Sequence, residues 1–334
     1  MKNLVFAFAL LCSTSLVAQF SYNANGTGIE SPYSTASGLD AFAVGWQTVA
    51  SGSVSAAMCD RTIASGDSST AMGRETQASG NFSTAMGNGT TASGWASTAM
   101  GYQTNAVGPA STAMGLVTTA SGEASNAMGY ETTASGTYST AMGFRTKAQD
   151  FVTTAIGVNN SPNETPNPSY FSLENTAFVI GNGAQYIQEN ENDGYFMIAP
   201  EYSSNAFEVL FDGTTTIAGD LNINSDARLK ANIISLGATL SKLLQIDGKT
   251  YTMKKDANHK KKIGLLAQDI EKVFPELVTE TNDIKSVNYQ GLVPVLINAM
   301  KEQQDEIDSY KTELTNQRKE IDELKTMVEQ LISK

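Results

Sequence analysis

The hexapeptide Ser-Asp-Ala-Arg-Leu-Lys at 225–230 places a serine hydroxyl and a lysine amine within one short stretch of chain. A serine becomes a nucleophile toward carbonyl carbons when a neighbouring base takes its proton. Lysine can be that base once burial or a nearby cation, such as Arg228, lowers its pKa. The same residues also fit a structural role, in which Ser225 caps the following helix and Lys230 lies on the surface.

Few other residues offer an alternative chemistry. His259 is the one histidine of the chain, so a His-rich zinc site is excluded and a Ser-His-Asp arrangement has a single candidate base. It lies in the lysine-rich segment 254–262, which we expect to be a solvated basic turn. A glycan-cleaving enzyme would need paired carboxylates, but the acidic residues between 19 and 160 are scattered. We therefore expect neither a metal nor a cofactor.

Net charge, the N-terminal segment and the cysteines limit which binding partners and which cellular location the sequence allows. The chain has 22 Lys and Arg against 34 Asp and Glu, a net charge of -12, so no basic surface is available for nucleic acid. Residues 1–18 combine a basic start, an apolar run and small residues up to Ala18. This pattern predicts a cleaved signal peptide and a secreted or cell-surface protein. The run is too short to span a bilayer, so no stable membrane insertion is expected. Cys12 would leave with it, and Cys59 would have no intrachain disulfide partner.

A 14-residue repeat occupies residues 38–157. Each unit carries two glycines seven residues apart, one in Ala-Met-Gly and one in Ala-Ser-Gly or a variant of it. We predict two sharp turns per unit at positions of positive φ, and therefore two short strands. In the Ser-Thr-Ala-Met segment, Ala and Met are expected to face a narrow interior, and Ser and Thr to face water. One unit buries too little to offset an ordering cost of about 1 to 2 kcal/mol per residue, so stacking and oligomerisation must supply the rest.

These repeats resemble the head repeats of YadA-type trimeric autotransporter adhesins, in both the period and the paired glycines. The resemblance implies a left-handed parallel β-roll for residues 19–157, assembled as a homotrimer. The proline-rich residues 158–175 predict a linker. Residues 176–224 predict a β-rich shaft, because short apolar runs alternate with Asn-Gly and Asp-Gly turns. The strands expected there lie at 178–180, 195–198, 207–211 and 214–217.

The remaining chain becomes rich in Lys and Glu. Between 225 and 290 we predict a helix at 233–244, a hairpin of 250–253 with 262–266, and a short helix at 268–274 that stops before Pro275. Residues 291–334 keep a heptad pattern over nearly six heptads, which predicts a parallel coiled coil without fixing its strand number. One core position holds Val293, Met300, Ile307, Leu314, Ile321 and Val328, and the other holds Leu296, Gln303, Tyr310, Gln317, Leu324 and Leu331.

Three further motifs, at 264–270, 275–278 and 288–289, follow the hexapeptide. Together they resemble the C-terminal intramolecular chaperone domain of phage tailspikes and endosialidases, over roughly residues 224–299. The resemblance implies a domain that drives trimerisation of a β-rich shaft and then cuts itself off with a Ser-Lys pair. Ser225 would be the nucleophile, Lys230 the general base, and the bond between Asn224 and Ser225 the cleavage site. The enzyme would be a serine endopeptidase that acts once, on its own chain.

Taken together, these features predict a mainly β homotrimer with a β-roll head, a β-rich shaft, an α+β chaperone domain at 225–290 and a C-terminal parallel coiled coil. We expect a secreted or surface-displayed trimeric adhesin-like fibre whose chaperone domain removes itself. A ligand on a host or matrix surface is left open. Two alternatives remain, a phage-type tail fibre protein and a structural surface protein that is not cleaved.

Overall fold

The computed structural model describes residues 21–183, 187–189, 196–198, 202–254 and 259–333. The predicted signal peptide, residues 1–18, lies outside the described residues. The chain divides into two compact units, Met1–Asn222 and Ile223–Lys334.

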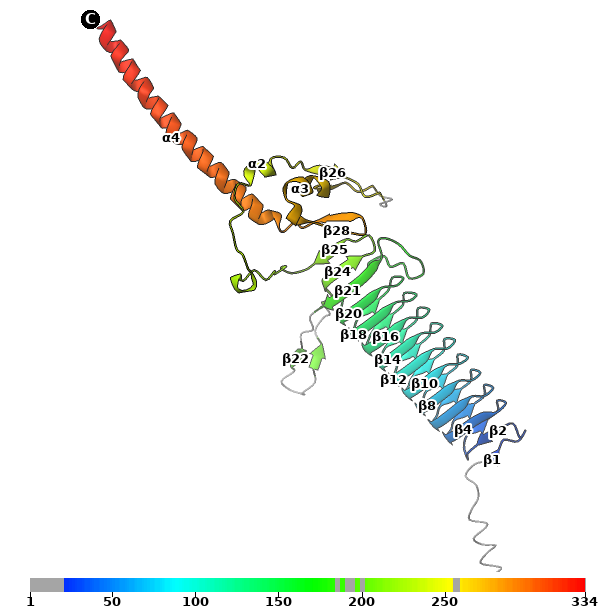
Figure 1. Ribbon diagram of the computed structural model, residues 1–334. Helices are drawn as coiled ribbons and strands as arrows, with labels where there is room; N and C mark the ends of the chain where they lie inside the picture. Colours follow the sequence, from blue (N-terminus) through cyan, green and yellow to red (C-terminus); the bar gives the residue numbers. More distant parts are fainter. Residues whose placement is uncertain (1–20, 184–186, 190–195, 199–201, 255–258, 334) are drawn as a thin grey trace, which may run out of the picture. The chain divides into compact units, whose positions relative to one another are not determined.

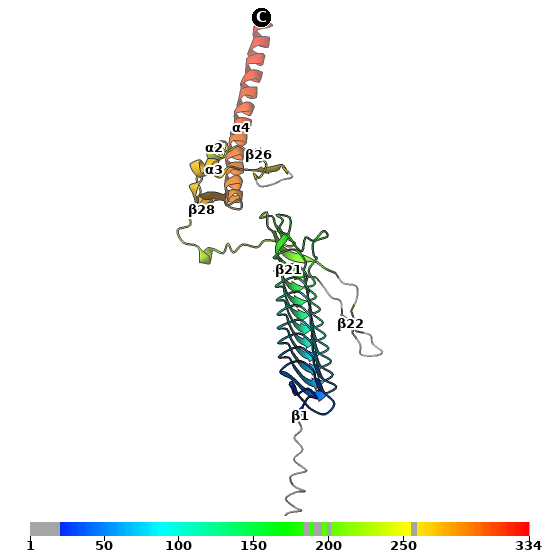
Figure 2. The ribbon, with the colours of Figure 1, turned by 90° about the vertical axis from the view of Figure 1, so that its right-hand side faces the viewer.

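The first unit is a β-solenoid in which each coil adds one strand to each of two sheets (Figures 1 and 2). The longer strands form sheet A: β4 (Ala41–Trp46), β6 (Ala56–Asp60), β8 (Thr70–Arg74), β10 (Thr84–Asn88), β12 (Thr98–Tyr102), β14 (Thr112–Leu116), β16 (Asn126–Tyr130), β18 (Thr140–Phe144) and β20 (Thr154–Val158). The shorter strands form sheet B: β3 (Thr35–Ala36), β5 (Val49–Ala50), β7 (Ile63–Ala64), β9 (Gln77–Ala78), β11 (Thr91–Ala92), β13 (Asn105–Ala106), β15 (Thr119–Ala120), β17 (Thr133–Ala134) and β19 (Lys147–Ala148).

Neighbouring coils pair in parallel with a shift of one repeat. Ala85 pairs with Ala99 in sheet A, and Ala92 pairs with Ala106 in sheet B. Equivalent residues of successive repeats therefore lie directly above one another. The parallel β-roll implied by the resemblance to YadA-type head repeats is confirmed.

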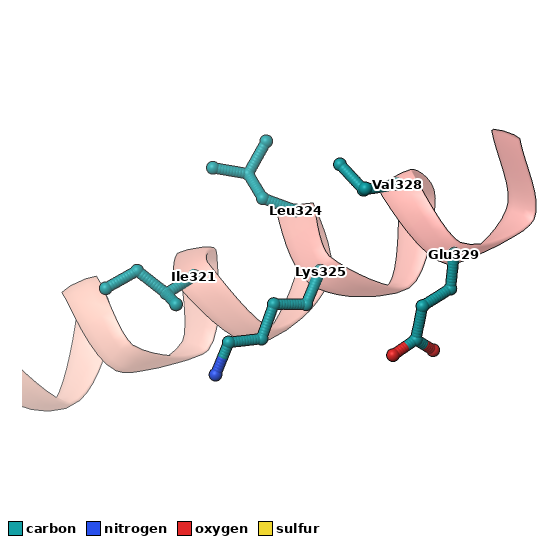
Figure 3. Close-up of a pocket in the computed structure, with 5 residues that line it drawn as sticks. All are labelled: Ile321, Leu324, Lys325, Val328 and Glu329. Carbon is teal, nitrogen blue, oxygen red and sulfur yellow. The ribbon is translucent and has the colours of Figure 1, made fainter. Parts of the chain in front are cut away.

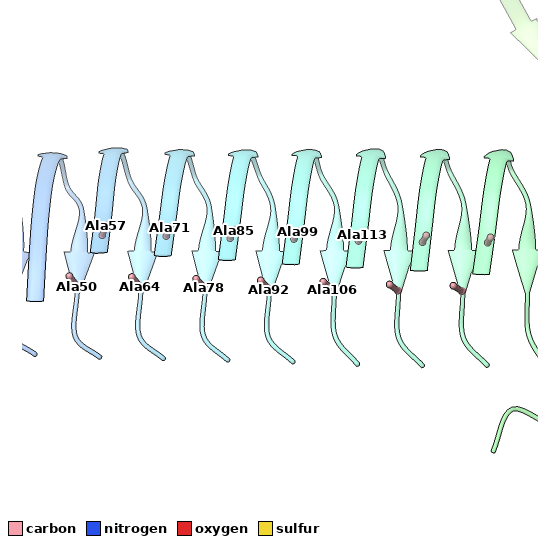
Figure 4. Close-up of a cluster of buried hydrophobic side chains, with 14 of the residues drawn as sticks. Ala50, Ala57, Ala64, Ala71, Ala78, Ala85, Ala92, Ala99, Ala106 and Ala113 are labelled. Carbon is pink, nitrogen blue, oxygen red and sulfur yellow. The ribbon is translucent and has the colours of Figure 1, made fainter. Parts of the chain in front are cut away.

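The interior is filled by alanine methyl groups from both sheets (Figure 4). Ala85, Ala92 and Ala99 are each 0% exposed, as are the equivalent alanines of the other full coils. Ser97 and Thr104 are also buried, and so are their equivalents. A core built from such small side chains requires the two sheets to lie close together.

The prediction that methionine faces the interior is wrong. Around β12, Ser97 and Ala99 are buried, whereas Thr98 and Met100 are only partly buried on the outer face. Adjacent residues of a strand take opposite faces, so Ser97 lies inside with Ala99, and the prediction that serine faces water is wrong as well. The narrow space between the sheets accepts a hydroxymethyl group and not a thioether. The outer face of sheet A therefore carries a column of methionines in register, which we call the methionine face. It consists of Met58, Met72, Met86, Met100, Met114, Met128 and Met142.

Both glycines of each repeat are required by close contact with the next coil, and one of them also by its backbone conformation. Gly101 in Ala-Met-Gly has a φ of 125°, as predicted, and a Cβ there would lie 2.0 Å from the oxygen of Gly115. Gly94 in Ala-Ser-Gly has no positive φ, but a Cβ there would lie 2.1 Å from the oxygen of Gly108. The prediction of positive φ thus holds for one glycine of each pair. In the second turn, the positive φ falls two residues later, on residues such as Ala96.

Side chains close both ends of sheet B. At one end, the Asn160 amide accepts from Lys147 N at 2.7 Å and donates to Lys147 O at 3.0 Å, so it takes the place of a next strand beside β19. At the other end, Ala36 N donates to the Glu30 carboxylate, and the Asn23 amide donates to Ala36 O. Both terminal strands are therefore satisfied without another chain.

Sheet A extends beyond the coils at both ends. β1 (Ser21–Tyr22) and β2 (Gly28–Glu30) precede β4. After β20, the strand β21 (Thr176–Asn182) adds in parallel, and β24 (Asn205–Leu210) and β25 (Thr215–Ile217) add antiparallel. β22 (Ile187–Glu189) and β23 (Phe196–Ile198) form a separate hairpin. β21, β23, β24 and β25 overlap the strands predicted from the sequence, whereas β1, β2 and β22 were not predicted.

Residues 158–175, predicted to be a linker, form a loop bound to the roll. Phe151 N donates to Asn167 O and Thr137 N donates to Pro168 O, both at 2.9 Å. The buried Asp150 carboxylate accepts from Asn167 N at 2.8 Å and from Thr176 N at 3.0 Å. The loop is thus held against the last coils by backbone hydrogen bonds.

The second unit is small and mixed. Its elements are η1 (Ala227–Leu229), α2 (Leu240–Leu243), β26 (Lys249–Tyr251), β27 (Lys262–Gly264), α3 (Ala267–Val273), η2 (Pro275–Leu277), β28 (Val278–Thr281), β29 (Ile284–Val287) and α4 (Leu292–Ile332). The predicted hairpin, β26 with β27, and the short helix before Pro275, α3, are confirmed. The helix predicted at 233–244 is wrong except for α2, because Gly237 takes a φ of 67° and the residues before it are exposed.

The core of this unit is formed by Ile270 of α3 and Phe274, the C-cap of that helix, with Leu292 and Val295 of α4. Tyr289 lies nearby, and its hydroxyl accepts from Leu265 N at 2.9 Å. Among the residues that the structure describes, no helix has the length and apolar content needed to cross a bilayer.

Candidate functional site

Ser225 and Lys230 are in direct contact. Lys230 Nζ lies 2.7 Å from Ser225 Oγ and donates to it. An ammonium can only donate across this distance, whereas a neutral amine would accept the hydroxyl proton. The pair that the sequence singled out therefore has the separation that proton transfer requires.

A single 3₁₀ turn brings the two side chains together. In η1, Leu229 N donates to Asp226 O and Lys230 N donates to Ala227 O, both at 3.1 Å. Asp226, and not Ser225, is the N-cap, because its carboxylate accepts from Arg228 N at 2.9 Å. The structural role suggested for Ser225 as a helix cap is thus taken by its neighbour.

The Arg228 side chain also donates hydrogen bonds to the Asp226 carboxylate. Nε lies 3.0 Å from Asp226 Oδ1, and Nη2 lies 2.6 Å from Oδ2. Hydrogen bonds from Arg228 lower the pKa of Asp226, and the Asp226 carboxylate raises the pKa of Arg228. Because this ion pair offsets the Arg228 charge, Arg228 does not act as the unpaired cation beside Lys230 that the sequence argument invoked.

The site lies on exposed chain. Every residue from 212 to 238 is exposed, including Leu229 at 71% and Ile234 at 87%. Exposure to water favours the charged form of a lysine. The burial that a lysine base requires is thus not supplied by the described residues of one protomer.

The long helix α4 presents an unpaired apolar face. From residue 303 to 333 every described residue is exposed, and Leu314, Ile321 and Leu324 of the predicted heptads are among them. Near the C-terminus, Ile321, Leu324 and Val328 line a shallow apolar groove together with Lys325 and Glu329 (Figure 3). A lone helix with such a face needs a partner to cover it.

Other candidate groups do not assemble into a site. His259 and Cys59 are both exposed. Within the described ranges, no group of three or more His, Cys, Asp and Glu side chains could hold a metal ion. The part of the basic turn at 255–258 lies outside the described residues.

Comparison with known families agrees with the resemblance seen in the sequence. Residues 225–279 match the family model described as chaperone of endosialidase. Residues 64–90, 92–116 and 120–146 match the model described as YadA head domain repeat. The chain thus combines a region of YadA-type head repeats with a region similar to the endosialidase chaperone, and the second match begins at Ser225.

Curated relatives are long tail fiber proteins Gp37 of phages. The protein of Salmonella phage S16 is 29% identical over 160 residues, which cover 45% of this chain and 20% of that protein. That of Enterobacteria phage M1 is 33% identical over 122 residues, covering 32% and 49%, and that of Enterobacteria phage Ox2 is 32% identical over 120 residues, covering 32% and 48%. The matched part of the chain spans at most about half the length of these relatives.

Proposed function

We propose that the chain is the subunit of a homotrimeric, surface-exposed fibre whose C-terminal domain is a trimerisation chaperone that cuts itself off between Asn224 and Ser225. The observation that carries the proposal is the 2.7 Å contact between Ser225 Oγ and Lys230 Nζ at the first residues of the chaperone family match. The residues on which the cut depends are Ser225 and Lys230.

Two unpaired apolar surfaces support assembly with further copies of the chain. One is the heptad face of α4, which lies open over most of its 41 residues. The other is the methionine face of the roll, whose side chains are only partly covered within one protomer. Polarizable methionine side chains adapt well to an opposing surface, and a parallel coiled coil would bring identical faces together in register.

The chemistry follows from the bond beside the nucleophile. Ser225 Oγ attacks the carbonyl carbon of Asn224 while a neutral Lys230 amine takes the hydroxyl proton. The peptide bond then breaks, the proton passes to the Ser225 nitrogen, and Asn224 becomes an ester on Ser225 Oγ. Water attacks this ester, Lys230 transfers a water proton to Oγ, and the products are a carboxylate at Asn224 and a new amino terminus at Ser225.

Assembly would switch this reaction on. In one protomer the hexapeptide is exposed, so nothing in that protomer provides the burial that a lysine base requires. Neighbouring chains that cover the exposed residues around Leu229 would remove water from Lys230. Cleavage would then report that the trimer is complete, and the head would persist because its unfolding is slow.

Mass spectrometry of the expressed full chain tests the cut. Wild type should yield a fragment corresponding to residues 225–334, and Ser225→Ala and Lys230→Ala should abolish it while leaving the trimer intact. Ser235→Ala, an exposed serine of the same segment, is the matched control and should cleave as wild type does. Mature wild-type trimers made of uncut chains would contradict the proposal.

A phage-type tail fibre is the second candidate, because the curated relatives carry that name. The N-terminal segment, with its signal-peptide pattern, favours secretion by a cell instead. Whether residues 1–18 are removed distinguishes the secreted fibre from the tail fibre. An N-terminus that begins at Gln19 in culture medium or on the cell surface supports a secreted fibre, whereas one that retains residues 1–18 in virions supports a tail fibre.

A further inference from the structure

We propose that Asp226 is the positioning residue of the Ser-Lys site. It acts through its hydrogen bonds and ion pair with the backbone N and the guanidinium of Arg228, which we call the clamp. The inference rests on the proposed self-cleavage and concerns how its two reacting groups are brought together. Ser225 and Lys230 touch each other directly, whereas Asp226 touches neither reacting atom in the described structure.

The clamp is local. Among the described residues, the hydrogen bonds of 225–230 all remain within the hexapeptide. No core side chain supports the turn, since all six residues are exposed. The turn must therefore be held by its own side chains, and the Asp226 carboxylate is the acceptor on which most of these bonds converge.

The carboxylate holds the turn from two directions. Oδ1 accepts from Arg228 N at 2.9 Å, which fixes the first peptide of η1. The Arg228 guanidinium then binds both carboxylate oxygens, and a bidentate contact of this kind restricts the Asp226 side chain to one orientation. The backbone leaves the turn at Lys230 in an extended conformation, with a φ of -119°, and the lysine side chain meets Ser225.

Loss of the clamp should therefore affect the alignment of the pair and not the assembly of the chain. A misplacement of about 1 Å between reacting groups costs on the order of a hundredfold in rate. Because neither Asp226 nor Arg228 supports the hydrophobic core of the unit, the trimer should form normally in their absence.

The test measures the rate of self-cleavage in full-length chains by mass spectrometry, with light scattering to check the trimer. Asp226→Ala should assemble and cleave about a hundredfold more slowly. Asp226→Asn keeps an acceptor oxygen for the cap and for Arg228, so it should stay within about tenfold of wild type. Asp220→Asn, an exposed carboxylate of the same stretch, is the control and should match wild type.

A double-mutant cycle adds a second readout. Arg228→Ala should slow cleavage nearly as much as Asp226→Ala, and the double variant should be little slower than either, because both changes remove the same clamp. Wild-type rates in Asp226→Ala would overturn the proposal. Equal losses in Asp226→Asn and Asp226→Ala would also overturn it, because they would indicate that the carboxylate itself transfers a proton. Failure of Asp226→Ala to form trimers would do so as well.

A measurement that does not depend on cleavage keeps the inference separate from the proposed function. In a full chain with Cys59→Ser and Ser225→Cys, iodoacetamide labelling of position 225 reports the nearby lysine, because an adjacent ammonium raises the thiolate fraction. Labelling should slow several-fold when either Lys230→Ala or Asp226→Ala is added. If Lys230→Ala slows the labelling and Asp226→Ala does not, position 225 and Lys230 are in contact but the proposed role of the clamp is wrong. If wild type never cleaves, the proposed function fails while this readout still decides the clamp.

Discussion

At the scale of single residues, the roll depends on positions where a Cβ does not fit. Cys59 occupies the slot that is glycine in the other coils, since it pairs with Gly45 on one side and Gly73 on the other. Its φ is 89°, a conformation that L side chains rarely adopt. The roll thus tolerates one exception in an early coil, at a cost in backbone strain.

Replacing the cysteine by glycine and a neighbouring glycine by cysteine should change the stability of the roll in opposite directions. Cys59→Gly should stabilise the roll by about 1 to 2 kcal/mol, because it relieves the positive φ. Gly73→Cys should destabilise it by at least a similar amount, since its Cβ would lie 2.0 Å from the oxygen of Gly87. Urea unfolding followed by the β-sheet signal in circular dichroism measures both. Similar midpoints for the two variants would contradict this account.

At the scale of elements, one carboxylate joins two helices of the chaperone unit. Glu302 of α4 accepts hydrogen bonds from Thr239 N and from Leu240 N, the latter at 3.1 Å, and so caps the start of α2. These backbone hydrogen bonds lower the pKa of Glu302. α2 is only four residues long, so it depends on this contact and on packing.

The lowered pKa gives a pH dependence with a definite sign. Because folding favours the ionised carboxylate, its contribution is fully present above the pKa of about 4.3 expected for an unfolded Glu, and it is lost as the pH falls through the lower folded value. In an uncleavable Ser225→Ala background, Glu302→Gln should lower the thermal midpoint of the helical signal at pH 7. The gap between the two chains should narrow as the pH falls below the unfolded pKa of about 4.3 and through the lower folded value.

Asp305→Asn is the matched control, because Asp305 is an exposed carboxylate on the same helix. It should leave the midpoint near that of the parent at both pH values. A gap for Glu302→Gln that stayed constant from neutral to acidic pH would show that the contact stabilises through shape alone.

At the scale of the whole molecule, the narrow roll leaves its largest apolar side chains outside. We infer that the methionine face of sheet A, and not the outer face of sheet B, packs against the other chains. Its members lie in register, so three identical faces could meet along their length. Sheet B offers mainly Thr, Gln and Asn at its outward positions in the middle coils.

Lysines introduced on one face or the other should show which face forms the interface between chains. Met114→Lys with Met128→Lys should break the head trimer once the chaperone is released, because three pairs of lysines would be buried without partners. Thr119→Lys with Thr133→Lys, on sheet B of the same coils, should leave it intact. Light scattering of the cleaved head gives the oligomeric state. Dissociation of the second variant alone would move the interface to the opposite face.

Local sequence signals explain which predictions for the second unit held and which failed. The hairpin of β26 with β27 and the helix α3 were predictable because local turn and stop residues bound them, including Pro275. The helix at 233–244 was predicted from leucine spacing alone, but most of that stretch has no surface to pack against in one chain. In the site, Ser225 and Lys230 were visible from type and spacing. The Asp226–Arg228 clamp was not, since Arg228 was considered only as an example of a nearby cation that could lower the pKa of the lysine.

The sequence by itself determined the period of the coils, the places of the turns and the heptads of α4, because these features repeat and depend on residues close together in the chain. Only the tertiary structure decided which face of each strand lies inside. Alternation gives two faces but does not say which is inner, and in the strands of sheet A the small distance between the sheets selects the face with Ala and Ser over the face with Met. The close approach of neighbouring coils, and not backbone conformation, explains why the glycine of Ala-Ser-Gly is needed, since a Cβ there would meet the carbonyl oxygen of the equivalent glycine in the next coil.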